Sequence, residues 1–254
     1  KLSKDQEKFR RRYHLISAGS MEALLHAKAH MLGKTSPYYG ALPVVTNASV
    51  ELWITYFKNA GRREFLRWLV RGESMRRVVQ PLLQASGVPS ELFYLAMIES
   101  GFNNGAKSRA RATGTWQFMQ GTARLYGLRM DHWVDERRDP VKSSLAAASL
   151  MKDLYRELGD WYLAMAAYNA GPGKVRRAIR RSGTKDFWAI SRTSLLAKET
   201  KQYVPKMLAA LLLATNSAAY GFNVVPNPAD EIPETEVTTH RPIRLDELAA
   251  ELGV

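Results

Sequence analysis

The strongest constraint on the fold is a succession of helix start and stop signals that runs from residue 50 to residue 219. Asp139 followed by Pro140 is typical of an N-cap and a first helical position, and Gly159 closes that segment. Asp160 then begins another segment. The apolar residues at helical spacing in the two segments are Ala147, Met151, Leu154, Tyr155 and Leu158, and then Trp161, Ala164, Met165 and Tyr168.

An earlier segment shows the same pattern, with one apolar face formed by Met75, Val78, Val79, Leu82 and Leu83. Gly87 follows this face, and Ser90 is predicted to cap the next helix, with Glu91 in its first turn. Clear hairpin signals are lacking between residues 50 and 219. We therefore predict a mostly α domain.

Composition limits the partners and the chemistry. The chain has 254 residues, 46% of them hydrophobic, which is enough for one large domain with appended arms. Its formal net charge of +13 favours anionic polymers such as nucleic acid, anionic lipid surfaces or a cell wall with free carboxylates. The absence of cysteine excludes disulfides, thiol nucleophiles and thiolate zinc sites.

The composition changes at both ends of the helical region. We predict an N-terminal arm over residues 1–48, a catalytic domain over residues 49–220, and an extended C-terminal tail with a short helix over residues 221–254. No apolar run approaches the roughly 20 residues that span a bilayer, and the N-terminus lacks the apolar centre of a signal peptide. We expect any leader or lipid anchor to have been removed or never to have existed.

Glu99 ends an apolar stripe. The segment LFYLAMI before it predicts a short buried helix, on which Leu92, Leu95, Ala96 and Glu99 share one face. Desolvation and the partial negative charge of the helix C-terminus both raise the pKa of such a carboxyl, as a general acid near neutral pH requires. The alternative is a glutamate turned to solvent at a fraying helix end.

Three segments in order carry a family resemblance: Glu99–Ser100 through NNGAKSRARATGTWQFMQGTA, AAYNAG at residues 166–171, and ETKQYV at residues 199–204. Together they resemble the lytic transglycosylases of the goose-lysozyme-like (SLT) superfamily, and especially the membrane-bound lytic murein transglycosylase D type. The resemblance runs from about residue 47 to about residue 219 and preserves the spacing between motifs. It implies a lysozyme-like catalytic domain.

The resemblance also assigns roles. It implies that Glu99 is the catalytic acid and base and that Ser108 orients its carboxyl. The residues that it places at the sugar are Ser108, Gln117, Phe118, Met119, Tyr168, Asn169, Glu199 and Tyr203, with Trp116 and Phe118 packing behind or beside the cleft. Arg111 stands where relatives usually have glycine, and Asn104 replaces a common proline.

Each assignment has a structural alternative. Trp116, Phe118 and Met119 are more often core residues, Ser108 and Asn169 are ordinary loop or cap residues, and Glu199 can simply pair with a lysine or arginine.

The implied reaction uses a single carboxyl. Glu99 would protonate the linkage between N-acetylmuramic acid and N-acetylglucosamine, then accept the proton of the muramoyl C6 hydroxyl as that oxygen attacks C1. The product would carry a 1,6-anhydro end, and no metal or cofactor would be required. The expected partner is the peptidoglycan glycan strand, met by a monomer in the periplasm or on the periplasmic face of the outer membrane, with outer-membrane association through a removed N-terminal anchor.

Other functions fit parts of the sequence. Glu199 across the sugar from Glu99 would allow a lysozyme-type hydrolase. A catalytically silent wall-binding protein would keep the same motifs. The basic runs GRREFLRWLVRGESMRR and KVRRAIRR, with Phe65 and Trp68 as stacking residues, would suit a nucleic-acid binder, although charge runs are usually solvated faces and we expect no nucleic acid.

Overall fold

The computed structural model describes residues 42–224 and 244–252, and most of them are helical. In chain order the elements are α3 (Ala48–Lys58), α4 (Arg62–Ala85), η1 (Ser90–Leu92), α5 (Phe93–Ser100), α6 (Gln120–Leu125), η2 (Glu136–Arg138), α7 (Pro140–Leu158), α8 (Trp161–Ala170), α9 (Pro172–Ser182), α10 (Phe187–Ser191), α11 (Lys198–Thr215), η3 (Ser217–Tyr220) and α12 (Leu245–Leu252). Extended pairing in these ranges is limited to isolated bridges. The predicted mostly α class is confirmed.

Local capping explains several of these boundaries. The Asp139 side chain accepts hydrogen bonds from two backbone N–H groups at the start of α7, and the Asp160 side chain accepts one from Leu163 at the start of α8. Gly159 ends α7 with φ +76°, a conformation that favours glycine. The predicted caps at these three positions are confirmed.

The predicted cap at Ser90 is wrong. Ser90 is instead the first residue of η1, and α5 follows η1 without a break. Leu92, which links the two, already has helical backbone angles. No extended residue therefore precedes α5 to place a capping side chain over its first N–H groups.

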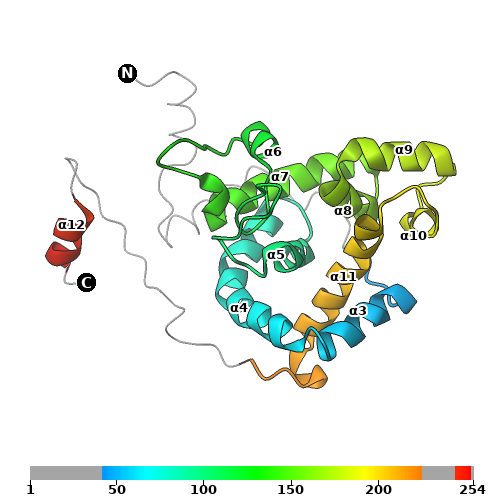
Figure 1. The fold of residues 1–254 in the computed structure, drawn as a ribbon, viewed down its shortest axis with the longest axis horizontal. Helices are drawn as coiled ribbons and strands as arrows, with labels where there is room; N and C mark the ends of the chain where they lie inside the picture. Colours follow the sequence, from blue (N-terminus) through cyan, green and yellow to red (C-terminus); the bar gives the residue numbers. More distant parts are fainter. Residues whose placement is uncertain (1–41, 225–243, 253–254) are drawn as a thin grey trace.

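Helix α5 lies at the centre of the molecule (Figure 1). Six of its eight residues, Phe93 to Ile98, are buried. Helix α11 packs against α3, α5 and α8, and α4 packs against α5 and α7. Burial on every side explains why the segment lacks a polar face, and it places the C-terminal end of α5 among the surrounding helices.

The segment between α5 and α6 forms a compact loop without regular strands. Thr113 and Phe118 exchange backbone hydrogen bonds at 3.1 Å in each direction, and Ser108 N–H donates to the carbonyl of Ala112 at 2.9 Å. The loop therefore has a defined shape despite its lack of helix.

Most of the predicted arm and tail lies outside the described residues, so the domain boundaries at 48 and 220 stay predictions. Within the predicted tail, the structure has the short helix α12. Among the described helices, none combines the length and the apolar character needed to cross a bilayer.

Candidate active site

Glu99 lies in the last turn of α5, where Gly101 closes the helix with φ +59°. A Cβ atom at Gly101 would overlap the indole ring of Trp68, so glycine is needed there for space as well as for conformation. The Glu99 carboxyl is enclosed by protein atoms, yet the residue keeps part of its surface accessible, as a reacting group must.

The environment of Glu99 favours its protonated form. Burial raises the pKa of this carboxyl to about 7, and the charge of Glu199 adds to the rise. The Tyr203 hydroxyl donates to Oε1 of Glu99 at 2.6 Å, and this hydrogen bond and the charge of Lys206 oppose the rise. The predicted desolvated carboxyl with a raised pKa is confirmed.

Tyr168 belongs to the same cluster. Its hydroxyl donates to the backbone carbonyl of Trp116 at 2.7 Å, and burial and the Glu99 charge raise the pKa of its phenol. Trp116 is fully buried, with its indole N–H donating to the Ser144 hydroxyl at 2.8 Å. Tyr168 thus links α8 to the loop that follows α5.

Phe118 takes the packing position that the resemblance implied for it behind or beside the cleft. Its side chain is only 2% exposed and packs edge to face with Tyr168, with ring centroids 6.4 Å apart. The Phe118 side chain therefore packs among hydrophobic residues behind the site. Met119, in contrast, is 47% exposed, as a side chain that meets a ligand must be.

Asn169 connects α8 to the start of α11. Its amide N–H donates to Oε1 of Glu199 at 3.1 Å, and its carbonyl oxygen accepts from the Thr200 hydroxyl at 2.8 Å. Thr200 is buried, whereas Glu199 is exposed. The structure therefore joins two predicted residues that lie 30 positions apart.

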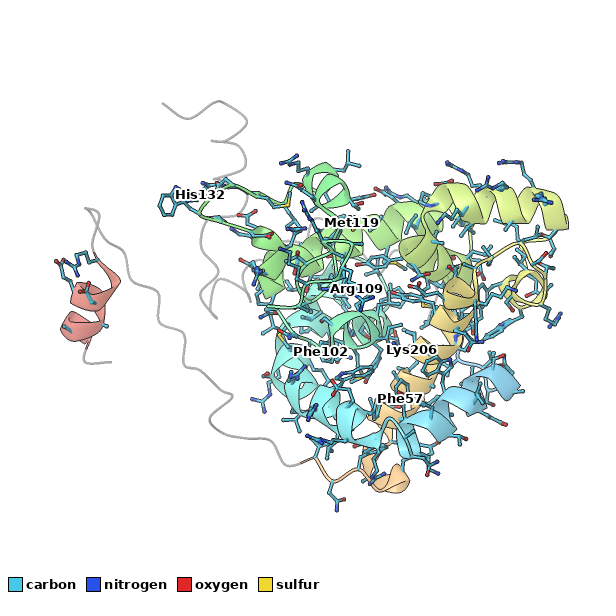
Figure 2. All side chains as sticks on the ribbon, viewed as in Figure 1. Phe57, Phe102, Arg109, Met119, His132 and Lys206 are labelled. Carbon is cyan, nitrogen blue, oxygen red and sulfur yellow. The ribbon has the colours of Figure 1, made fainter. Side chains whose placement is uncertain are left out.

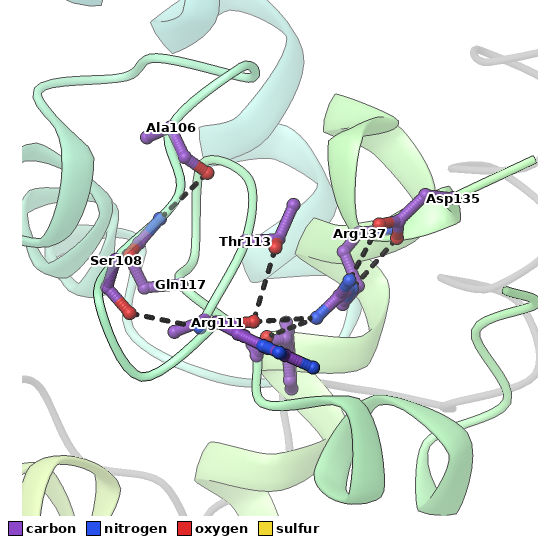
Figure 3. Close-up of polar contacts among 9 residues, drawn as sticks. Ala106, Ser108, Arg111, Thr113, Gln117, Asp135 and Arg137 are labelled. Atoms are coloured by element: carbon purple, nitrogen blue, oxygen red, sulfur yellow. Dashed lines mark hydrogen bonds and ion pairs between the residues drawn. The ribbon is translucent and has the colours of Figure 1, made fainter.

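The predicted hydrogen bond from Ser108 to Glu99 is not among those of residues 42–224. The Ser108 hydroxyl oxygen accepts from the Ala112 backbone N–H at 3.0 Å (Figure 3). The serine closes its own loop in this way, and Tyr203 is the hydrogen-bond partner of the Glu99 carboxyl.

Gln117 holds the loop from the other side. Its amide donates to the carbonyls of Ala106 and Gly114 at 3.3 and 2.9 Å. Its backbone has φ +49°, in the left-handed region. Strain of this kind persists only where the surrounding contacts fix the chain.

Arg111 also has a left-handed backbone, with φ +65°. The family resemblance predicts glycine at this position, and a left-handed backbone is a conformation that glycine adopts more readily than other residues. Asn104, in place of a common proline, accepts a hydrogen bond from the Thr115 hydroxyl. Both departures are thus accommodated by the loop.

Sequence reasoning missed Arg137. Its guanidinium donates to the carbonyls of Arg111 and Phe118, each at 3.1 Å, and is held by a two-pronged ion pair with Asp135 (Figure 3). The side chain is only 11% exposed. An arginine within a charged run carries no sequence signal of such a contact.

Lys206 was also missed. It lies one helical turn after Tyr203, and its Nζ donates to the carbonyl of Ile98 at 3.3 Å. Helical spacing from Tyr203 is the signal that would have found it, since residues three apart share a face. Within the described part of the chain, no cluster of His, Asp or Glu has the makeup of a metal site.

Comparison with known proteins finds a family model and similar sequences that are named as transglycosylases. A model described as "Transglycosylase SLT domain" matches residues 79–191. The chain is 36% identical to membrane-bound lytic murein transglycosylase D of Escherichia coli K12 over 190 residues, which cover 73% of this chain and 41% of that protein. It is 30% identical to the soluble lytic murein transglycosylase of the same strain over 120 residues, which cover 45% of this chain and 19% of that protein.

Among solved structures, an inactive mutant of the lytic transglycosylase Slt from Pseudomonas aeruginosa aligns with a TM-score of 0.49 and 26% identity, over 60% of this chain and 25% of that chain. The chain spans less than half of the length of the curated relatives given above. These matches place a transglycosylase SLT domain within this chain and make the chain similar to the membrane-bound lytic murein transglycosylase D type.

Proposed function

We propose that this chain is a peptidoglycan lytic transglycosylase that cleaves the linkage between N-acetylmuramic acid and N-acetylglucosamine without adding water. The observation that carries the proposal is the Glu99 carboxyl, whose pKa burial raises to about 7. A carboxyl with this pKa is protonated in part of the molecules near neutral pH, so it can give a proton and later take one. Relatives named lytic murein transglycosylases support the choice of substrate.

In the proposed reaction, protonated Glu99 donates to the glycosidic oxygen as the bond from that oxygen to C1 of the muramoyl residue breaks. The C6 hydroxyl of the same residue then attacks C1 and releases its proton to the Glu99 carboxylate. One C–O bond breaks and one forms, and Glu99 ends protonated as it began. No water, metal or cofactor enters the balance.

We assign supporting roles to the surrounding residues. Tyr203 holds the Glu99 carboxyl through its 2.6 Å hydrogen bond, and the exposed side chains of Met119 and Glu199 face the sugars. Asn169 fixes Glu199, and Gln117 shapes the loop beside the site. Ser108 keeps an O–H that donates to no described residue and is free to meet either the substrate or Glu99.

The proposed setting is the cell envelope, in the periplasm or at the periplasmic face of the outer membrane, with the chain acting as a monomer on glycan strands. The excess of positive charge suits a wall that carries free carboxylates.

Glu99→Gln tests the catalytic assignment. The amide keeps the shape and accepts the Tyr203 hydrogen bond, but it cannot donate a proton to the leaving oxygen, so we expect release of soluble fragments from purified sacculi to stop. Glu51→Gln is the matched control, because Glu51 is exposed in the first turn of α3. Circular dichroism must show both variants folded, and cleavage by Glu99→Gln at near the parental rate would refute the assignment.

Product mass separates the transglycosylase from a hydrolase. The Glu199 charge acts on Glu99, so a second carboxylate is present near the first. Anhydro products are lighter by one water than lysozyme-type products. Mass spectrometry of digested sacculi should find anhydro ends, and a digest with reducing ends alone would make the enzyme a hydrolase.

A further inference from the structure

The final turn of α5 has carbonyl groups without partners inside the helix, as every α-helix end does. The carbonyl of Ile98, directly before Glu99, accepts from Nζ of Lys206 at 3.3 Å. The carbonyl of Gly101 accepts from Arg71 at 3.0 Å. A cation at this helix end is favourable because the end carries partial negative charge.

Two indole rings fix the Lys206 ammonium. It lies 5.6 Å from the ring centroid of Trp53 and 5.5 Å from that of Trp68. These distances are in the range of cation–π attraction, which is stronger where water is reduced. Figure 2 shows Lys206 on α11, near the centre of the molecule.

The two tryptophans are themselves held in place. The indole N–H of Trp53 donates to the Gln202 side chain at 2.8 Å, and the indole N–H of Trp68 donates to Glu64 at 2.9 Å. The missing side chain at Gly101 provides the space that the Trp68 ring occupies. The ammonium therefore lies between two tryptophan rings that side chains of α4 and α11 hold in place.

Helix α11 presents two groups to the end of α5 from successive turns. Tyr203 reaches the Glu99 carboxyl and Lys206 reaches the carbonyl of the preceding residue. Among the described residues, the charged and titratable groups that interact with the carboxyl are Tyr168 from α8 and Glu199, Tyr203 and Lys206 from α11. Lys206 is the cation of this set.

We propose that Lys206 is a positioning residue, a fixed positive charge that holds the end of α5 and stabilises the ionised Glu99 carboxylate left after the proton passes to the sugar oxygen. This role rests on the proposed function of Glu99. The fixed ammonium needs no reorganisation when the carboxylate forms, which is the condition for an electrostatic contribution to the rate. The opposing effect of Lys206 on the raised pKa of Glu99 agrees with it.

The test compares Lys206→Met, which keeps an unbranched side chain and removes the charge, with Lys206→Arg, which keeps the charge. Lys198→Met is the matched control, because Lys198 is exposed at the start of the same helix. Carbon-13 NMR of the glutamate side-chain carboxyls is followed over pH, and the Glu99 signal is the one absent from Glu99→Gln.

We expect the titration midpoint of Glu99 to move to higher pH in Lys206→Met and to stay at the parental value in Lys206→Arg and Lys198→Met. On sacculi, Lys206→Met should lose roughly tenfold or more in kcat with little change in KM, and the alkaline limb of its pH profile should move upward. A merely structural lysine would leave the midpoint unchanged.

Equal midpoints in the parent and in Lys206→Met would overturn the proposal, whatever the activities. The NMR titration needs no turnover, so an inactive parent would refute the proposed function while the Lys206 result still stands by itself. If Lys206→Met does not fold, Lys206→Gln carries the test, because its amide can still donate to the Ile98 carbonyl but has no charge.

Discussion

The burial of Glu99 has two effects: it raises the pKa of the carboxyl, and it lowers the stability of the fold when that carboxyl ionises. Burial raises the pKa of its carboxyl from 4.5 to about 7, so the folded state binds a proton that the unfolded chain releases across this interval. Stability from this group is therefore full below about pH 4.5 and is lost as the pH rises to about 7. The same preference for the proton makes the carboxyl suitable as an acid near neutrality.

This linkage predicts how stability changes with pH. Because one pKa unit corresponds to about 1.4 kcal/mol, the parent should lose on the order of 3 kcal/mol relative to Glu99→Gln between pH 4.5 and pH 8. Urea unfolding of both proteins at several pH values measures the difference and cancels the contributions of other carboxyls. A difference that stays constant with pH would show that Glu99 is not desolvated.

The loop between α5 and α6 is ordered by contacts from another element. Arg137 of η2 binds two of its carbonyls, and the backbone of the same residue approaches Gly114 so closely that a Cβ atom there would overlap it. Gln117 and Met119 are carried by this loop. Its left-handed residues are therefore held by the packing of η2 rather than by local preference.

Arg137→Ala should consequently loosen the loop. It leaves two carbonyls without their donor and the Asp135 carboxylate without its partner, so we expect a loss of about 2–4 kcal/mol in the free energy of unfolding and a higher KM on sacculi. Arg137→Lys should recover only part of both, because an ammonium cannot reproduce the planar fork of the guanidinium. Arg129→Ala, which removes a more exposed ion pair with Asp131, is the control and should lower the free energy of unfolding much less. An Arg137→Ala protein with parental stability and KM would contradict this account.

The whole molecule carries an excess of positive charge. The net charge of +13 includes exposed cations along α9, namely Lys174, Arg177, Arg180 and Arg181. This field attracts anionic polymers, such as the proposed wall substrate, over a distance set by the salt concentration. Binding to an anionic polymer and its proposed cleavage can therefore be measured separately, because binding depends on the total charge and cleavage depends on Glu99.

A binding experiment with sacculi should distinguish the two. Folded Glu99→Gln is expected to sediment with sacculi at low salt and to be released progressively as salt approaches about 1 M, where the screening length falls to about 3 Å. The parent should cleave with a similar salt dependence. Salt-independent sedimentation would show that contacts other than charge dominate, and steep salt-dependent binding to DNA at lower protein concentration would favour the nucleic-acid alternative.

Features that depend only on neighbouring residues in the chain could be predicted from the sequence. The start of α7 at Asp139, its end at Gly159, the start of α8 at Asp160 and the buried character of α5 follow from caps and periodicity within a few residues. The raised pKa of Glu99 also followed, because an apolar stripe already implies desolvation. The error at Ser90 arose where two helical segments join without an extended residue between them.

Contacts between residues far apart in the chain could be found only in the folded structure. Tyr203 and Glu99 are 104 positions apart, and Lys206 and Ile98 are 108 apart. Packing likewise determines three other features: the burial of Phe118, the Ser108 hydrogen bond inside its own loop, and the hydrogen bond from Arg137 to the carbonyl of Phe118. Caps and periodicity act over one or two helical turns. The surroundings of a carboxyl instead depend on which helices pack around it, and that packing is fixed only when the core forms.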